Sequence, residues 1–279
     1  MSALAITGTK GFLGSNVLSA IGRYFPETNV SCVTYASSII KLPETSFKLL
    51  LAGGYSPKSS QEFNVSEARG AREFVERLLA SRAQLCSQVW LVSSTDASSL
   101  NDAGDANDLA PRGKERTQYQ DHKKEMERFT QDICRKIGLG LVIIRLGPLY
   151  GPGEESYHRL IPATIKSAIA GDRFQFRGDS RFQRPFLFSR DAAGVLSQMV
   201  HSEIEPGTYD LVGKEQIDWN RIKTAVDTAV RGLRAGTPDR DIAIDYRAEF
   251  EVQGRTIRLL NSTAFESGIQ EEVRRNFRK

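Results

Sequence analysis

The sequence predicts an α/β fold in which a doubly wound parallel sheet is followed by a smaller C-terminal lobe. In the first half of the chain, short apolar runs alternate with stretches of helical periodicity, which is the pattern of successive βα units. A glycine-rich turn separates the first apolar run from the first helical stretch. Beyond Gly151 the alternation loosens and prolines punctuate the sequence. We therefore expect a first domain over residues 1–150 and a second over residues 151–279, with some late segments returning to the sheet.

The expected elements follow one another from the N-terminus. The apolar run at residues 3–7 is the first strand, and helical periodicity begins at Ser15. The next strands are expected over residues 29–35 and 47–54. Apolar residues at helical spacing predict two longer helices, which alternate with two further strands. These helices are expected over 66–79 and 119–137, and these strands over 88–93 and 141–146.

Size and charge indicate a globular protein with a small anionic ligand. The chain has 279 residues and a mass of 31.0 kDa, enough for one large domain or for a domain with an added lobe. Its formal net charge of +4 results from 38 basic and 34 acidic residues, which are mostly interspersed. A small positive surplus suits an anionic small ligand. The sequence has no basic stripe interleaved with aromatic residues, so we do not expect a nucleic-acid partner.

Cysteine usage and hydropathy indicate a reduced compartment. Cys32, Cys86 and Cys134 are odd in number and widely spaced, which argues against a disulfide framework and a zinc site. No apolar run approaches about 18 residues and the first strand starts close to the N-terminus, so we expect neither a membrane span nor a signal peptide. The expected location is the cytoplasm. The histidines are scattered, and we expect no metal site from His122, His158 and His201.

The glycine turn predicts a dinucleotide cofactor. In a strand, turn and helix unit, the first glycine permits the tight turn, the second lets the backbone approach the phosphates, and the third lets the helix pack on the strand. The start of the helix adds unpaired N–H groups and a favourable dipole. The residues of this turn that we expect to bind the cofactor are Gly8, Thr9, Lys10, Gly11, Phe12, Leu13 and Gly14.

A tyrosine and a lysine in the middle of the chain are suited to proton transfer. Tyr119 and Lys123 lie four residues apart on an expected helix, so their side chains project from the same face. A nearby ammonium group lowers the pKa of a phenol, which allows Tyr119 to exchange a proton with a hydroxyl or carbonyl oxygen while a hydride moves to or from nicotinamide. Hydroxyl residues end the preceding strand, where loops of a parallel sheet hold ligands. They are Ser93, Ser94 and Thr95.

With the glycine turn, the hydroxyl cluster and the Tyr/Lys pair in this order, the chain resembles the extended short-chain dehydrogenase/reductase family. Within that family it is similar to the branch of nucleotide-sugar epimerases and dehydratases, along nearly its whole length. The resemblance implies a Rossmann-like sheet and a C-terminal lobe that binds the substrate. Further matching segments are Leu51-Ala52-Gly53, Asn64-Val65, Glu127, the stretches 145–153 and 207–213, Gly178-Asp179, Arg184 to Phe188, and Asp191.

The resemblance implies a role for each matched residue. Thr95 takes the position of the catalytic serine or threonine, Tyr119 is the acid/base, and Lys123 orients the ribose and tunes Tyr119. Ser93 and Ser94 stay open as alternatives for the working hydroxyl, because the end of the strand is uncertain by a residue or two. The further implied cofactor contacts are Ser37, Leu51, Ala52, Gly53 and Pro148, and the implied substrate contacts are Ser94, Arg184 and Arg255.

The sequence departs from the family pattern near the sugar. Dehydratases of the family commonly have Thr-Asp-Glu where this chain has Thr95-Asp96-Ala97. The glutamate is the expected base for elimination, so its replacement disfavours 4,6-dehydration. Asp96 remains a candidate catalytic proton donor. Ser180 and Pro185 also replace the usual residues in the segment around Arg184.

The adenosine end departs as well. A carboxylate normally follows the second strand and holds the ribose hydroxyls of NAD, whereas residues 36–41 read Ala-Ser-Ser-Ile-Ile-Lys. Small hydroxyls and a lysine suit a 2′-phosphate, which slightly favours NADP over NAD. The link from the second strand to Lys48 is too short for a helix, an edge strand and another helix. We therefore expect the third, edge strand of the family to be missing or reduced, and cofactor binding to be weakened or altered.

Together these observations predict an NAD(P)-dependent enzyme that oxidises or reduces a carbon of a nucleotide-activated hexose, with C4 preferred. The outcome is epimerisation or ketoreduction. The alternative enzyme is a 4,6-dehydratase with an unusual base. The alternative of another class is a cofactor-binding regulatory protein without catalysis, because fold does not prove function. By analogy with the family, we expect a homodimer that forms through the helix carrying Tyr119 and its neighbour.

Overall fold

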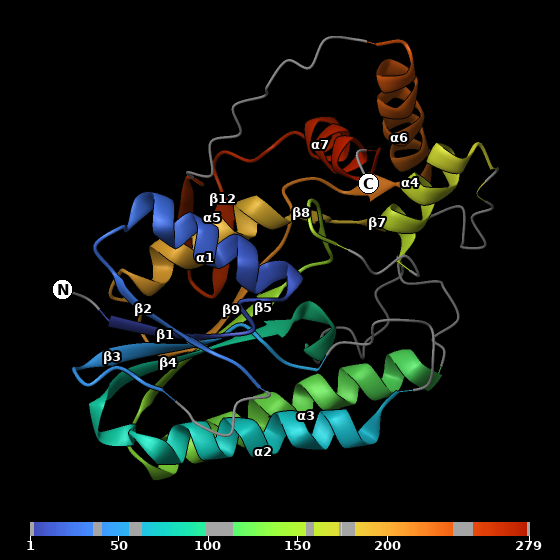
Figure 1. Cartoon of the computed structure of the whole chain (residues 1–279). Helices are drawn as coiled ribbons and strands as arrows, with labels where there is room; N and C mark the ends of the chain where they lie inside the picture. Colours follow the sequence, from blue (N-terminus) through green and yellow to red (C-terminus); the bar gives the residue numbers. More distant parts are fainter. Residues whose placement is uncertain are drawn as a thin grey trace.

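The centre of the fold is a single large sheet (Figure 1). The computed structural model describes residues 3–35, 41–55, 63–98, 114–154, 159–172, 174, 182–236 and 248–277, with the backbone alone for 114–117 and 277. Within these residues, eight strands form the sheet in the order β11-β12-β9-β5-β4-β3-β1-β2. Neighbouring strands are parallel except for β11 and β12. The strands are β1 (Ala3–Thr7), β2 (Asn29–Val33), β3 (Phe47–Leu51), β4 (Cys86–Ser94), β5 (Gly140–Leu146), β9 (Gly207–Leu211), β11 (Phe250–Gln253) and β12 (Thr256–Leu259).

Helices cover both faces of the sheet, as a doubly wound fold requires. Figure 1 shows α1 (Phe12–Tyr24) and α5 (Ser189–Val200) on one face, with α2 (Val65–Ser81) and α3 (Lys114–Lys136) on the other. Side chains alternate along each strand between the two layers. In β4, Trp90 packs in the core beneath α1 and α5, whereas Val89 and Leu91 pack beneath α2 and α3. The predicted α/β, Rossmann-like fold is therefore correct.

A smaller lobe packs beside the carboxyl ends of the central strands. It contains its own core, in which Tyr150, Ile161, Phe188, Ile222 and Ile269 are buried together. Its two-residue strands pair with each other in two small sheets that are separate from the central sheet. The segments β9, β11 and β12 return from this part of the chain to the central sheet. The elements of the lobe are β6 (Leu149–Tyr150), α4 (Leu160–Ala170), β7 (Gln183–Arg184), β8 (Leu187–Phe188), β10 (Ile217–Asp218), α6 (Trp219–Arg234) and α7 (Phe265–Phe277).

The prediction about the third strand needs correction. A third strand in chain order, β3, is present, and it pairs with β1 on the side opposite β2. The described residues of the link from β2 to β3 contain no strand, and β2 forms the edge of the sheet as described. Leu42 from this link is buried in the core beneath α2 and α3. The short link therefore crosses the sheet and contributes to its core.

The start of α2 illustrates how local sequence sets the element bounds. Asn64 is the N-cap, and its side-chain oxygen accepts a hydrogen bond from the Glu67 backbone N–H. The Asn64 amide in turn donates to the Glu67 carboxylate at 3.1 Å. The first bond satisfies a backbone N–H that a helix start otherwise leaves open, and the second holds the capping side chain in place. Asn64-Val65 therefore begins the helix that follows β3.

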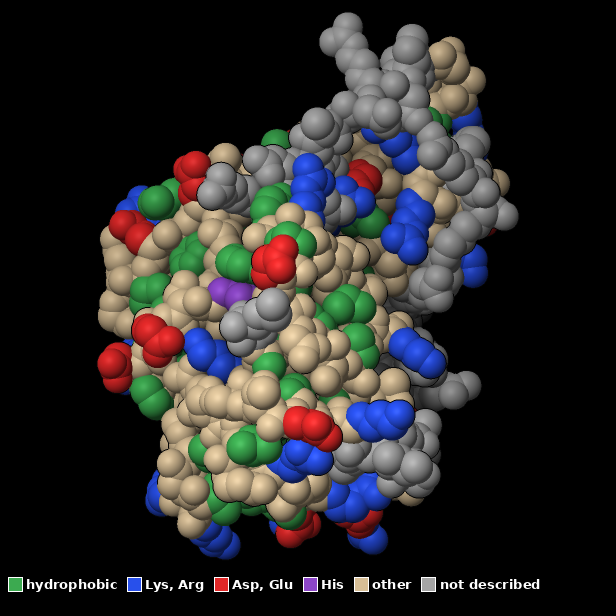
Figure 2. Space-filling model, turned by 60° about the vertical axis from the view of Figure 1, so that its left-hand side comes forward, with side chains coloured by type: hydrophobic (Ala, Val, Ile, Leu, Met, Phe, Trp, Pro, Cys, Tyr) green, Lys and Arg blue, Asp and Glu red, His purple; other side chains and the backbone are tan. Residues whose placement is uncertain are grey.

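The described residues show three general features. On the face seen in Figure 2, basic and acidic side chains are interspersed, with small hydrophobic areas between them. Among the described helices, none is long and apolar enough to cross a membrane. Likewise, no group of three or more His, Cys, Asp or Glu side chains in the described part of the chain is arranged to hold a metal ion.

Candidate functional site

The glycine turn after β1 is built by close backbone contact. Gly8 has a φ of 72°, which favours glycine, and a Cβ placed there would lie 2.4 Å from the Cα of Gly53. A Cβ on Gly14 would lie 2.1 Å from the carbonyl oxygen of Gly8. The Gly11 N–H donates to that same oxygen at 2.8 Å. These glycines therefore bring the first turn of α1 and the end of β3 directly against the turn.

The start of α1 is suited to an anion. Gly11 is the N-cap and offers no side-chain hydrogen bond, so the first N–H groups of the helix have no side-chain cap. Gly11 and Lys10 are exposed, Thr9 and Phe12 are half-buried, and Leu13 belongs to the core beneath α1 and α5. Any contact of Leu13 with a phosphate is therefore through its backbone. The uncapped N–H groups of this turn suit the negative charge of a dinucleotide pyrophosphate. Glycine at position 14 is needed for this geometry, because a larger residue would displace the helix that supplies the N–H groups.

The Tyr/Lys pair lies at the same edge of the sheet. The Lys123 Nζ is 3.8 Å from the position that a Cβ on Gly54 would take, and it is 5.5 Å from the centroid of the Tyr119 ring. Gly54 follows Gly53, whose N–H donates to the Thr7 hydroxyl at 3.1 Å. The ammonium group of Lys123 on α3 therefore lies next to the loop that contacts the glycine turn.

The hydroxyl cluster at the end of β4 adjoins this helix. Ser93 is buried, and its Oγ has no hydrogen-bond partner among the described residues. The Ser94 Oγ accepts a hydrogen bond from the Asp96 N–H at 3.2 Å and caps the short helix η2 (Thr95–Ala97). Thr95 and Asp96 are half-buried, and η2 packs against α3. All three hydroxyl residues thus lie near α3, and the choice among them stays open.

A buried ion pair fixes α3 on the sheet. Arg145 of β5 donates from Nε and Nη2 to the two carboxylate oxygens of Glu127, at 3.0 and 2.7 Å. Glu127 lies one helical turn after Lys123. Asp210 of β9 lies opposite Arg145 in the sheet. Burial raises the pKa of the Asp210 carboxyl group, and the positive charge of Arg145 opposes that rise. This bidentate geometry holds the rotation of α3, and hence the direction of Lys123.

An aromatic cluster anchors the other side of the helix. The His122 ring packs edge-on against Tyr55 and Phe63, with centroids 5.6 and 5.8 Å away. Burial lowers the pKa of His122 to about 4, so the ring is neutral at physiological pH. The Tyr55 hydroxyl accepts a hydrogen bond from the Asn64 N–H at 2.8 Å. The sequence showed His122 as an isolated histidine, and the partners that give it a role come from segments far away in the chain.

The expected substrate side is brought close to the end of β5. The Leu187 N–H donates to the Pro148 carbonyl at 2.9 Å, and the Gly213 N–H donates to the Pro185 carbonyl at 3.1 Å. Arg184 lies on β7 and is half-buried. The expected cofactor contact Ser37 and the matched pair Gly178-Asp179 lie outside the described residues.

Arg255 does not join this group. Its Nη1 donates to the Pro206 carbonyl at 3.3 Å, and its guanidinium lies 5.0 Å from the centroid of the Tyr209 ring. Pro206 precedes β9, whereas the glycine turn follows the carboxyl end of β1. Because these strands are parallel, Pro206 lies at the amino ends of the strands and the glycine turn at their carboxyl ends. The guanidinium of Arg258 faces Glu251 on the neighbouring strand β11.

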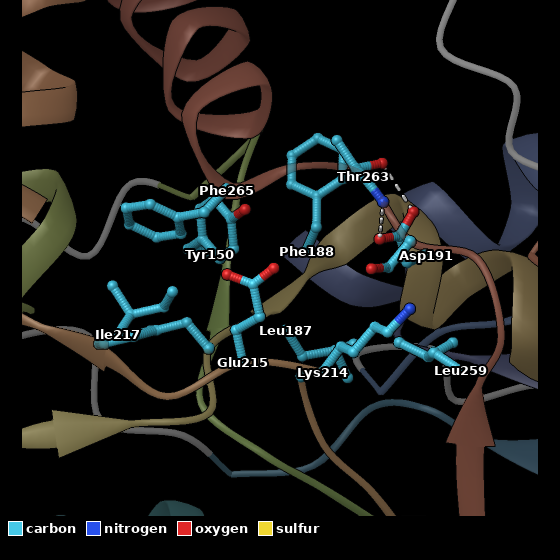
Figure 3. Close-up of a pocket in the computed structure, with 13 residues that line it drawn as sticks. Tyr150, Leu187, Phe188, Asp191, Lys214, Glu215, Ile217, Leu259, Thr263 and Phe265 are labelled. Carbon is cyan, nitrogen blue, oxygen red and sulfur yellow. Dashed lines mark hydrogen bonds between the residues drawn. The ribbon is translucent and has the colours of Figure 1, made fainter. Parts of the chain in front are cut away.

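A small pocket lies where the lobe meets α5 and β12 (Figure 3). In it, the Asp191 carboxylate accepts hydrogen bonds from the N–H and the hydroxyl of Thr263, both at 2.8 Å. Lys214, Glu215 and Phe265 also line the pocket. Its volume of about 30 Å³ holds a few waters at most and is too small for a nucleotide sugar. Asp191 therefore ties the segment before α7 to α5.

Comparison with known proteins identifies a family for most of the sheet half. The model of the NAD dependent epimerase/dehydratase family matches residues 49–211, which is more than half of the chain and runs from β3 to β9. The glycine turn lies before the matched region. A comparison with curated proteins gives no match.

Solved structures share the whole fold at low identity. The dTDP-glucose 4,6-dehydratase of Bacillus anthracis str. Ames, in complex with NAD, is 16% identical, with a TM-score of 0.67 and coverage of 100% of this chain and 97% of that chain. The UDP-N-acetylglucosamine 4-epimerase of Bacillus cereus is 18% identical, with a TM-score of 0.66 and full coverage, 100%, of both chains. The corresponding enzyme of Methanobrevibacter ruminantium M1, in complex with UDP-N-acetylmuramic acid, is 15% identical, with a TM-score of 0.68 and coverage of 99% and 98%.

These likenesses agree with the geometry at the carboxyl edge of the sheet, where a glycine turn, a Tyr/Lys pair and a hydroxyl cluster lie together. The identities are low, so the solved structures show the fold alone. The family model covers more than half of the sequence. The chain therefore belongs to the NAD dependent epimerase/dehydratase family.

Proposed function

We propose that this protein is an NAD(P)-dependent nucleotide-sugar epimerase or ketoreductase that acts at a hexose carbon, with C4 preferred. The observation that carries the proposal is the position of Lys123. Its ammonium lies beside Gly54, and the preceding residue, Gly53, touches Gly8 of the glycine turn. Proton-transfer groups and the cofactor cradle therefore meet at one edge of the sheet.

The chemistry follows from these groups. A bound nicotinamide cofactor supplies the hydride acceptor or donor. Tyr119 exchanges a proton with the sugar oxygen at the reacting carbon, and the ammonium of Lys123 stabilises the phenolate. Thr95 is the proposed hydrogen-bond partner of the same oxygen, with Ser94 and Ser93 as the alternatives. Arg184 is proposed to hold the diphosphate of the nucleotide sugar through charge-assisted hydrogen bonds.

The composition of η2 favours this chemistry over dehydration. Ala97 is buried and has no group that accepts a proton. Asp96 is the carboxylate of this short helix and is proposed as a proton donor. A 4,6-dehydratase would need a base from another segment. It remains the alternative enzyme, and a non-catalytic cofactor-binding regulator is the alternative outside the enzymes.

The first experiment is a binding titration. NADH and NADPH are added to the purified protein with and without UDP-, dTDP-, GDP- and CDP-hexoses, and nicotinamide fluorescence and thermal stability are recorded. We expect a reduced nicotinamide cofactor to bind and one nucleotide sugar to strengthen its binding. The absence of binding by both cofactors would favour the non-catalytic alternative.

The second experiment tests Tyr119. The substitution Tyr119→Phe should leave cofactor affinity nearly unchanged and lower kcat by about 100- to 10,000-fold, the usual share of general acid–base catalysis. The matched control is Tyr209→Phe, which should retain activity. The Tyr209 hydroxyl donates a hydrogen bond to the Glu205 carbonyl before β9. Equal kcat values for Tyr119→Phe and the unmodified protein would remove Tyr119 from the mechanism.

A homodimer is part of the proposal. The helices expected at its interface, α2 and α3, carry exposed charges that include the Arg72–Glu125 ion pair. Association through these helices would therefore place charged pairs in the interface. Light scattering should give a mass of twice 31.0 kDa for a homodimer, and a monomer mass over the working concentration range would reject it.

A further inference from the structure

The adenosine end of the cofactor crevice has no acidic residue in the usual place. Val33, the last residue of β2, is paired with Thr7, which directly precedes the glycine turn. In dinucleotide-binding folds, a carboxylate shortly after this strand holds the adenosine ribose. Here Thr34 and Tyr35 follow β2, and the first acid along the sequence is Glu44. Another interaction has to hold this end of the ligand.

Tyr35 is placed at this end by contacts with α2. The Tyr35 hydroxyl donates to the Glu67 carbonyl at 3.4 Å, and its ring lies 5.1 Å from the Phe74 ring, centroid to centroid. A Cβ on Gly70 would lie 2.3 Å from the Tyr35 hydroxyl, so glycine at this position makes room for the tyrosine. The contacts are with the first turns of α2, which follows the carboxyl end of β3. The ring therefore lies at the same edge of the sheet as the glycine turn.

The Tyr35 side chain combines support with exposure. It is 49% exposed, and it is the one aromatic residue among the exposed large hydrophobic side chains of the described residues. Packing against Phe74 limits the movement of its ring. A supported aromatic ring that presents apolar surface next to a nucleotide crevice has the properties of a stacking platform for a base.

We propose that Tyr35 receives the adenine of the dinucleotide by stacking and so replaces the carboxylate that would hold the ribose. This inference rests on the proposed function, because it requires a dinucleotide in the crevice. Stacking is insensitive to a 2′-phosphate, whereas a carboxylate at the ribose repels one. The Tyr35 platform therefore predicts similar affinities for NADH and NADPH.

The test separates the two ends of the ligand. Dissociation constants of NADH, ADP-ribose and reduced nicotinamide mononucleotide are measured by calorimetry for the unmodified protein and for Tyr35→Leu and Tyr35→Phe. Leucine retains an apolar contact with Phe74 but has no ring. Val252→Ala, an exposed apolar position on the far edge strand β11, is the matched control.

We expect Tyr35→Leu to weaken the binding of NADH and ADP-ribose by about 5- to 150-fold, the range of base–aromatic stacking. Binding of the mononucleotide, which has no adenine, should not change, and Tyr35→Phe should stay close to the unmodified protein. Unchanged ADP-ribose binding in a folded Tyr35→Leu variant would overturn the platform and leave the proposed function intact. If the unmodified protein binds none of these ligands, the proposed function fails, and the platform fails with it.

Discussion

The sheet half and the C-terminal lobe differ in how they accommodate buried charge. In the sheet half, the Glu127 carboxylate has a bidentate partner in Arg145. In the lobe, Glu272 of α7 is 1% exposed, and neither carboxylate oxygen makes a well-formed hydrogen bond. Burial and the nearby Glu154 raise the pKa of Glu272 well above its usual value. A strand thus supplies the counter-charge for a carboxylate of α3, whereas the contact between a loop and α7 in the lobe brings carboxylates together.

The largest expected effect is the loss of the paired carboxylate in the sheet half. Glu127→Gln removes the bidentate counter-charge of the Arg145 guanidinium and should lower the free energy of unfolding by about 3 kcal/mol, since Asp210 still faces Arg145. The control is Glu125→Gln, which removes the exposed ion pair with Arg72 and should cost less than about 1 kcal/mol. Denaturant unfolding at pH 7.5 measures both values. Similar losses of unfolding free energy in the two variants would show that the Glu127–Arg145 ion pair stabilises the protein no more than an exposed ion pair does.

The second prediction is that the two halves respond to pH in opposite directions. The pKa of His122 falls from 6.5 in the unfolded chain to about 4 in the folded one, so the folded state binds fewer protons between these values. Stability is then lost as the pH falls from 6.5 towards 4, by up to about 3 kcal/mol. Burial raises the pKa of Glu154 in the lobe from 4.5 to about 7. Its protonated form is favoured by folding, and stability is lost as the pH rises from 4.5 to 7, by a similar amount.

Unfolding free energies between pH 4.5 and 8 separate these contributions. His122→Asn should flatten the acidic limb, and Glu154→Gln should flatten the limb from pH 5 to 7. Glu154→Gln also removes the attraction of the ionised carboxylate for Arg159, so the gain in stability above pH 7 is partly offset. Curves for both variants that run parallel to that of the unmodified protein would contradict the assigned titrations.

The third prediction concerns the glycine turn. Gly14→Ala places a Cβ 2.1 Å from the Gly8 carbonyl oxygen and should cost about 1 to 3 kcal/mol, with a large loss of cofactor affinity because α1 has to move. Gly22→Ala is the control on the same helix, where a Cβ would meet no atom within 4 Å. It should stabilise the helix by about 0.5 to 1 kcal/mol and leave cofactor binding unchanged. If the Gly14→Ala protein bound NADH with normal affinity, the position of α1 would not determine cofactor binding, and the prediction would be wrong.

The same contrast explains what could be predicted from the sequence. The glycine turn, the strands of the first half and the Tyr119/Lys123 spacing depend on short stretches of chain, and their local pattern shows them. Glu127 was matched as part of the catalytic helix, but its partner Arg145 is 18 residues away and belongs to a strand. Which strand neighbours α3 is a property of the packed fold, so the pair itself could not be predicted.

Other features had no local signal. Arg255 was selected because the family has a late arginine, yet a two-residue turn between β11 and β12 directs its side chain to Pro206. Gly54 and Tyr35 were not singled out, since their importance depends on Lys123 and on Gly70 of another element. Glu272 stands among charged residues near the end of the chain and resembles a solvated helix position. It is buried because α7 packs on the loop that begins at Gly151, whose amide is the group that favours its ionised form.

The smallest predicted effect tests this buried carboxylate directly. Glu272→Gln has nearly the same shape and removes the charge, so the cost of ionising a buried, poorly paired group disappears. At pH 8 the variant should be more stable than the unmodified protein by about 1 kcal/mol or more. At pH 4.5 the difference should be close to zero, because Glu272 is protonated in the folded state. The same substitution thus has opposite signs at Glu127 and Glu272. A loss of stability at pH 8 for Glu272→Gln would mean that its carboxylate is paired, and the two halves of the molecule would then treat buried charge alike.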